Sequence, residues 1–203
     1  MATKLHRGDL PAGIDFGSVV AVDTETMGLD LKRDALCLIQ LSAGDGNAHL
    51  VQIDRANREA PHLKALLENP AVLKIFHFAR FDIAVLKAHL GVEVTPLYCT
   101  KIASRLVRTY TDRHGLKDLV RELLGIELSK QQQSSDWGAP VISDAQKQYA
   151  AQDVLYLHEI KARLDQMLRR EGREALAQAC FSFLPVRATL DLSGWREEDI
   201  FAH

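Results

Sequence analysis

The feature that most constrains the fold is residues 19–29, where an apolar, β-branched run leads directly into Asp23 and Glu25 and is broken at Gly28. This pattern predicts a buried strand that carries two carboxylates at its end. Alternate side chains of a strand share a face, so Asp23 and Glu25 are expected to lie together. Two neighbouring anions are tolerated when a shared proton or a cation neutralises them, and oxygen-only ligands suit Mg2+ or Mn2+. A plain polar turn after the strand is the alternative interpretation.

The composition is that of an ordinary globular protein. The chain has 203 residues, 47% of them hydrophobic, so we expect one α/β domain over residues 1–203 with a sizeable core. The net charge of -2 provides no overall attraction to long polyanions, so any nucleic-acid contact must come from local basic residues or a short substrate. The three cysteines form no CxxC pair, and neither a signal peptide nor a membrane-length apolar run is present. We therefore expect a cytoplasmic protein that does not engage a membrane.

The order of the predicted elements indicates a mixed sheet flanked by helices. Residues 1–18 contain Gly8, Pro11, Gly13 and Gly17 and are expected to form an irregular lead-in. After the strand that begins at residue 19, further strands are predicted at residues 35–42, 48–53, 72–78 and 96–99. The first three strands are expected to form an antiparallel meander. Helical spacing is found at residues 61–68, 81–89, 100–107 and 116–124.

The last third of the chain begins with its longest polar stretch, residues 129–140, which we predict to be a loop. Ser143 followed by Gln146 is a capping-box pattern, so a long helix is expected from residue 144 to about residue 170. Residues 174–203 form a C-terminal tail in which a helix is followed by Pro185 and a mixed segment. The many apolar residues of this tail must be buried somewhere, and packing onto the same domain is the simplest expectation.

Three further residues are candidates for the same site as Asp23 and Glu25. Asp82 falls in the first turn of the helix predicted at residues 81–89. Tyr149 and Asp153 lie four residues apart on the long helix and therefore share a face. Each signal has a structural alternative, because a carboxylate stabilises a helix N-terminus and Tyr149 can simply pair with Asp153.

Taken together and in this order, Asp23-x-Glu25, Asp82 and Tyr149-x-x-x-Asp153 resemble the DEDDy family of 3′-5′ exonucleases. The resemblance implies an RNase H-like α/β fold, with these five residues catalytic and with two Mg2+ or Mn2+ ions per site. Asp23 is expected to bridge both ions, Glu25 and Asp153 to complete the site of the attacking water, and Asp82 to hold the second ion. Tyr149 is expected to orient or deprotonate that water.

Within this family the chain resembles the RNase D branch, and most closely the short stand-alone enzymes of the nano-RNase C group. The likeness is carried by residues 99–104, 109–117, 129–137, 190–195 and 199–203. It implies 3′-5′ hydrolysis of short RNA, dinucleotides included, to nucleoside 5′-monophosphates. It also implies a homo-oligomer, an octameric ring in that group, with part of the C-terminal tail in subunit contacts. One departure is Phe78, which stands after the motif histidine where many relatives have asparagine.

The substrate contacts are open to more than one interpretation. Leu29 stands where the family uses an apolar wedge between terminal bases, but a leucine after glycine equally often packs. His77 is expected either to touch the 3′ nucleotide or to be a buried, hydrogen-bonded histidine. Lys130 and Trp137 combine a cation with an aromatic ring, which suits a phosphate and a base. A basic run is more typical of a solvated helical face, and it comprises Lys101, Arg105, Arg108, Arg113, His114, Lys117 and Arg121.

Two other functions fit the same residues. One is a DEDDy exonuclease that trims the 3′ ends of longer RNA or acts on DNA. The other is a non-catalytic RNA-binding module of the same fold, which loss of a carboxylate or of Tyr149 would have favoured. A metal-free hydrolase is disfavoured, since the sequence has no Gly-x-Ser-x-Gly elbow.

Overall fold

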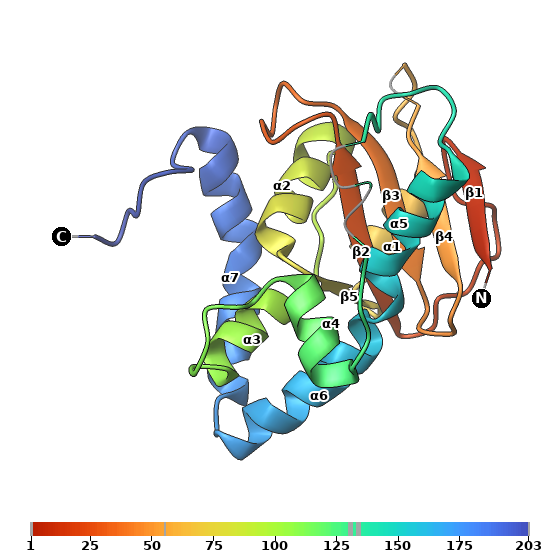
Figure 1. Ribbon diagram of the computed structural model, residues 1–203. Coiled ribbons are helices and arrows are strands. Elements are labelled where there is room, and N and C mark those ends of the chain that lie inside the picture. Colours follow the sequence, from red (N-terminus) through yellow and green to blue (C-terminus); the bar gives the residue numbers. More distant parts are fainter. Residues whose placement is uncertain (1, 55, 130–131, 133–134, 203) are drawn as a thin grey trace.

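A six-stranded mixed sheet forms the centre of the computed structural model, which describes residues 2–54, 56–129, 132 and 135–202 (Figure 1). The strand order is β1-β4-β3-β2-β5-β6. Strands β2, β3 and β4 pair antiparallel, as the meander predicted, while β1–β4, β2–β5 and β5–β6 pair parallel. The predicted mixed sheet with flanking helices is confirmed. The strands are β1 (Thr3–Arg7), β2 (Val19–Thr26), β3 (Leu36–Ser42), β4 (Ala48–Gln52), β5 (Leu73–Phe76) and β6 (Leu97–Cys99).

The helices form two groups around this sheet. Helix α5 packs across β2, β3 and β4, and α2 contacts β2, β3 and β5. Helices α3 and α4 pack on α6 beside β5, and α7 packs mainly on α2, with further contacts to β6, α3 and α6 (Figure 1). None of the helices in the described residues is both long and apolar enough to span a bilayer. The helices are α1 (Pro61–Glu68), α2 (Ala79–Leu90), α3 (Thr100–Val107), α4 (Leu116–Leu124), α5 (Asp144–Leu155), α6 (Leu157–Arg170) and α7 (Glu174–Ser193).

The expectation of an irregular lead-in over residues 1–18 is wrong in part. Residues 3–7 form β1, an edge strand that pairs parallel with β4. An edge strand has a neighbouring strand on one side only, and none of the residues of β1 is fully buried. The sequence of β1 is therefore mostly polar and lacks the apolar run that is typical of a buried strand. The glycines that suggested irregular structure all follow the strand.

The single helix expected from residue 144 to about residue 170 is two helices. The capping box is present, because the Ser143 hydroxyl accepts from Gln146 N and the Gln146 side chain accepts from Ser143 N. The chain then changes direction at Tyr156, which ends α5 and precedes α6. The break allows α5 to pack on the sheet and α6 to pack against α3, α4 and α7.

The C-terminal helix is longer than expected, because α7 continues through Pro185 to Ser193. A proline inside a helix removes one backbone hydrogen bond and costs about 3 kcal/mol. Burial of Phe181, Leu184 and Ala188 in the main core offsets this cost. Part of the apolar tail therefore packs on the same domain, as expected. Other tail side chains stay exposed, namely Leu176, Phe183, Val186, Trp195, Ile200 and Phe201.

Candidate active site

The end of β2 delivers two carboxylates to one place. Asp23 and Glu25 are alternate residues of the strand, and the ladder with β3 is interrupted directly after Glu25. Oxygens of Asp23, Glu25 and Asp153 all lie within 4.8 Å of one another. The structure thus brings together residues separated by more than half of the chain.

Asp153 and Tyr149 reach this place from α5. The capping box fixes where α5 begins, and residues four apart then point toward the same side. The Tyr149 ring packs against Trp137, with ring centroids 6.1 Å apart. The helix therefore presents a phenol and a carboxylate together to the end of β2.

Asp82 is buried in the first turn of α2 and lies beside this cluster. The Thr24 hydroxyl donates a hydrogen bond of 2.7 Å to Asp82 Oδ1. Asp82 is outside the group of three carboxylates whose oxygens lie within 4.8 Å of one another. It is nevertheless close enough that its charge raises the pKa of Asp23, Glu25 and Asp153.

The electrostatics of the cluster are those of crowded, desolvated anions. Burial first, and then repulsion by neighbouring carboxylates, raises the pKa of Glu25 to about 9 and that of Asp153 to about 7. The same causes raise the pKa of Asp23 well above its ordinary range. Burial raises the pKa of Asp82 to about 7, although the Thr24 hydrogen bond opposes the shift. An oxygen-only donor set with this excess of negative charge fits a hard divalent cation.

A cavity of about 620 Å³ opens over the carboxylates. Leu29 lines it with a side chain that is 72% exposed, and His77 lines it with a half-buried ring. Three other lining residues, Phe81, Leu116 and Ser135, gave no local signal in the sequence. They reach the cavity through the packing of α2, α4 and the loop before Trp137, which no short motif encodes.

His77 is a neutral, hydrogen-bonded residue in the cavity wall. Its Nδ1 lies 2.8 Å from the Thr100 hydroxyl oxygen. Burial, followed by the charge of Lys101, lowers the pKa of His77 to about 3. Both expectations for this residue are compatible with the geometry, since the ring is held by Thr100 and still faces the cavity.

Trp137 lies in the cavity wall and is only 3% exposed. It packs in a small second core with Leu38, Leu50 and Ile142. Little of the ring is therefore open for stacking with a base, and its clearest contact is with Tyr149. Lys130, the other candidate from this loop, lies outside the described residues.

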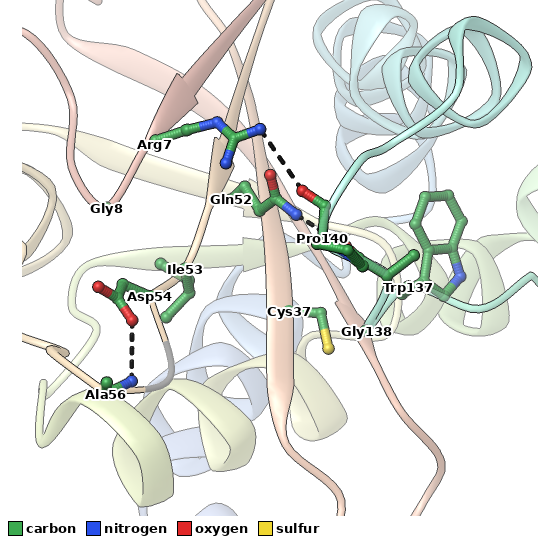
Figure 2. Close-up of a pocket in the computed structure, with 11 residues that line it drawn as sticks. Arg7, Gly8, Cys37, Gln52, Ile53, Asp54, Ala56, Trp137, Gly138 and Pro140 are labelled. Carbon is green, nitrogen blue, oxygen red and sulfur yellow. Dashed lines mark hydrogen bonds between the residues drawn. The ribbon is translucent and has the colours of Figure 1, made fainter.

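A second cavity, of about 540 Å³, is also lined by Trp137 (Figure 2). Its polar side chains hold the loop that carries this tryptophan. Arg7 Nη2 donates to the Pro140 carbonyl at 3.4 Å, and Gln52 Nε2 donates to the Ala139 carbonyl at 3.0 Å. The edge strand β1 and its neighbour β4 thus fix the loop against the sheet.

The turn after β2 requires glycine at one position. A Cβ on Gly28 would lie 2.2 Å from Asp34 Oδ2. That carboxylate is held in place by the Asp30 backbone N–H at 3.0 Å. Glycine therefore allows the turn to close tightly and to present Leu29 at the cavity.

The basic run is not uniformly solvated. Arg108 is fully buried and pairs with Glu122, while its Nη1 donates to Ser104 Oγ at 3.0 Å and to the Arg113 carbonyl. The prediction of a solvated face is thus wrong for Arg108, which braces α3 against α4. Phe78 has a left-handed backbone (φ 73), and Lys101 Nζ lies 4.1 Å from the centroid of its exposed ring.

Comparison with known proteins agrees with this geometry. The model of a family described as 3′-5′ exonuclease matches residues 10–169. This chain belongs to the 3′-5′ exonuclease family. The match spans the end of β2, the start of α2 and all of α5, so the carboxylate cluster lies within the exonuclease domain.

Relatives of this exonuclease domain include ribonuclease D of Acidiphilium cryptum, 36% identical over 76% of this chain and 39% of the relative. The chain thus spans about two fifths of that relative's length. Several solved structures match this chain from end to end, and two of them follow. Brucella melitensis NrnC bound to pGG is 55% identical, covers 100% of this chain and 99% of its own, and has a TM-score of 0.97. Brucella melitensis NrnC with bound Mg2+ is 54% identical, with 100% coverage of both chains and a TM-score of 0.96.

Proposed function

We propose that this chain removes nucleotides from the 3′ end of short RNA, dinucleotides included, and releases nucleoside 5′-monophosphates. The observation that carries the proposal is the convergence of Asp23, Glu25 and Asp153 beside Tyr149 in one open cavity. A hydroxyl and several carboxylates around a cation site suit hydrolysis of a phosphodiester by an activated water.

The similar proteins support a short substrate. A structure of Brucella melitensis NrnC holds pGG, and that protein aligns with this chain over its whole length. The ribonuclease D relatives are longer proteins, of which this chain matches a part. We therefore base the proposal of a short substrate on Brucella melitensis NrnC, which matches the whole chain.

The proposed cofactor is a pair of Mg2+ or Mn2+ ions. Asp23, Glu25 and Asp153, whose oxygens lie within 4.8 Å of one another, would hold the ions, with Asp23 as the shared ligand and Glu25 and Asp153 beside the attacking water. Asp82, which accepts a hydrogen bond from the Thr24 hydroxyl, would hold the second ion. When bound, the ions would lower the pKa of the attacking water and neutralise charge that develops on the phosphate.

Tyr149 is proposed to orient the attacking water. Burial and the charges of Asp153, Glu25 and Asp23 raise the pKa of its hydroxyl, so it keeps its proton at neutral pH. A protonated phenol beside the carboxylates can donate a hydrogen bond to the attacking water and so fix the orientation of that water.

The proposed substrate contacts are Leu29 and His77, with Trp137 acting as the support behind Tyr149. An exposed leucine on the cavity rim can insert beside the terminal base, because a base has apolar faces. His77 faces the same cavity as a neutral hydrogen-bonding group, which suits a ribose hydroxyl.

The experiment is a comparison of initial rates with 5′-labelled RNAs of two to about twenty nucleotides in Mg2+. We expect the highest rates on the shortest RNA, loss of activity in EDTA, and loss of activity for Asp23→Asn. Higher rates on long RNA or on DNA would favour a trimming enzyme instead. RNA binding without hydrolysis would favour the non-catalytic module.

We also propose a cytoplasmic homo-oligomer. Exposed apolar side chains on the C-terminal tail support subunit contacts, including Phe201, which is 64% exposed and packs against Phe183. The thiols of Cys99 and Cys180 suit a reducing compartment. Light scattering at micromolar concentration tests the assembly, and a monomer would refute it.

A further inference from the structure

The segment after α7 turns back to the rim of the active-site cavity. Helix α7 ends at Ser193, and three residues later Arg196 Nη1 donates a hydrogen bond of 2.7 Å to the Leu29 carbonyl. The bond joins residues 167 positions apart in the sequence. The acceptor, Leu29, is the residue whose exposed side chain lines the cavity beside the carboxylates.

Arg196 is itself held firmly. Its carbonyl accepts hydrogen bonds from Arg80 Nη2 at 2.7 Å and from Arg187 Nη2 at 2.9 Å. Both guanidinium groups also pair with Asp191, whose side chain is only 3% exposed. Charge-assisted and bidentate bonds of this kind fix geometry as well as adding energy.

This network connects the two sides of the active site. Arg80 lies in the first turn of α2, two residues before Asp82, and contacts Asp191 through two bonds of 2.7 and 2.8 Å. The C-terminal segment therefore links the helix that carries Asp82 to the turn that carries Leu29. A side chain as exposed as Leu29 makes few packing contacts of its own, so its position depends on how its backbone is held.

We propose that Arg196 is a positioning residue that sets the place of Leu29 against the terminal nucleotide of the substrate. The inference rests on the proposed function. Without the guanidinium, the Leu29 carbonyl loses its bond to the C-terminal segment and the turn samples other positions. Substrate binding then weakens, while the carboxylates and Tyr149 keep their geometry.

The test compares Arg196→Met, Arg196→Lys and Leu29→Ala, with 5′-phosphorylated diguanylate as substrate in Mg2+. Arg163→Met is the matched control, because Arg163 is an exposed arginine of α6 whose ion pair with Glu159 spans 3.8 Å. We expect Arg196→Met to raise KM about tenfold with kcat within about twofold, since one charge-assisted hydrogen bond is lost. Arg196→Lys should recover part of the loss, and Arg163→Met should match the wild type.

The double variant separates positioning from a general structural role. If Arg196 acts through Leu29, adding Arg196→Met to Leu29→Ala raises KM by less than about twofold. Additive effects, or a wild-type KM for Arg196→Met, would overturn the inference. Thermal unfolding and Mg2+ calorimetry on each variant identify any loss of fold or of the metal site. A wild-type protein that fails to cleave the dinucleotide would overturn the proposed function and this inference together.

Discussion

Replacing Asp153 with asparagine should stabilise the metal-free protein while removing its activity. Asp153 shares a crowded site with Asp23 and Glu25, and burial followed by the charge of Asp82 raises its pKa to about 7. Asparagine has nearly the same shape and carries no charge. The variant therefore tests whether the fold bears an electrostatic cost to keep this site acidic.

The magnitude follows from the difference between the folded and ordinary pKa values. The interval from 3.8 to about 7 corresponds to about 4 kcal/mol at 1.36 kcal/mol for each factor of ten. A carboxyl group with a raised folded-state pKa supports the fold below its unfolded pKa and loses that contribution as pH rises through the folded value. The cost of Asp153 is therefore small near pH 4, about 0.6 kcal/mol, and nearly complete above about pH 7. A buried amide also needs partners, so we expect a net gain of about 2–4 kcal/mol at pH 8.5.

The assay is thermal unfolding in EDTA at pH 4 and pH 8.5, followed by titration with Mn2+. For a chain of this size the expected gain raises Tm by about 5–15 °C at pH 8.5, with little gain at pH 4. The control is Asp144→Asn, an exposed carboxylate on the same helix, which should not raise Tm. Added Mn2+ should stabilise the wild type and have little effect on Asp153→Asn. A variant no more stable than the wild type at pH 8.5, or equally stabilised at both pH values, would refute the reasoning.

Three other substitutions test the site and the neighbouring strand β3. Tyr149→Phe should lower kcat about 100-fold or more while Mn2+ binding measured by calorimetry stays nearly unchanged, and normal turnover would exclude its role. Gln40→Met should raise the free energy of unfolding by about 1–3 kcal/mol in urea titrations, because both buried amide atoms of Gln40 lack hydrogen-bond partners among the described residues. Gly28→Ala should cost about 1–3 kcal/mol in stability and raise KM for the dinucleotide, because its Cβ would meet the Asp34 carboxylate; an unchanged Tm would contradict the close contact.

The carboxylates could be predicted because each follows a local rule. Asp23 and Glu25 end an apolar strand, Asp82 begins a helix, and Asp153 lies one turn after Tyr149 on a helix whose start a capping box marks. The alternation of side chains along a strand and the periodicity of a helix determine the direction in which each side chain points from its own element. The resemblance to DEDDy exonucleases then supplied the expectation that the three elements meet.

The features that the sequence did not reveal depend on contacts between distant segments. β1 has no apolar pattern, and it is a strand because β4 offers an edge to pair with. The break at Tyr156 arises because α5 and α6 pack against different neighbours. Arg108 belongs to a basic run that is typical of a solvated surface, yet Glu122 and the Arg113 carbonyl satisfy it in the interior. In each case a contact with a segment distant in the sequence determines the local structure, and this contact outweighs the structural propensity of the local sequence.

The contrast between these two groups explains how the site is built. The acidic residues that would bind cations are placed by the ends of regular elements, which are rigid. Residues that border the two cavities, in contrast, depend in part on long-range hydrogen bonds, such as those from Arg7 and Gln52 to the loop after Trp137 and from Arg196 to Leu29. Removing a rim bond should therefore alter which substrates bind, whereas removing a carboxylate should abolish the chemistry. Proteins with the same carboxylate cluster but different rim contacts can accordingly share a reaction and differ in the length of RNA that they accept.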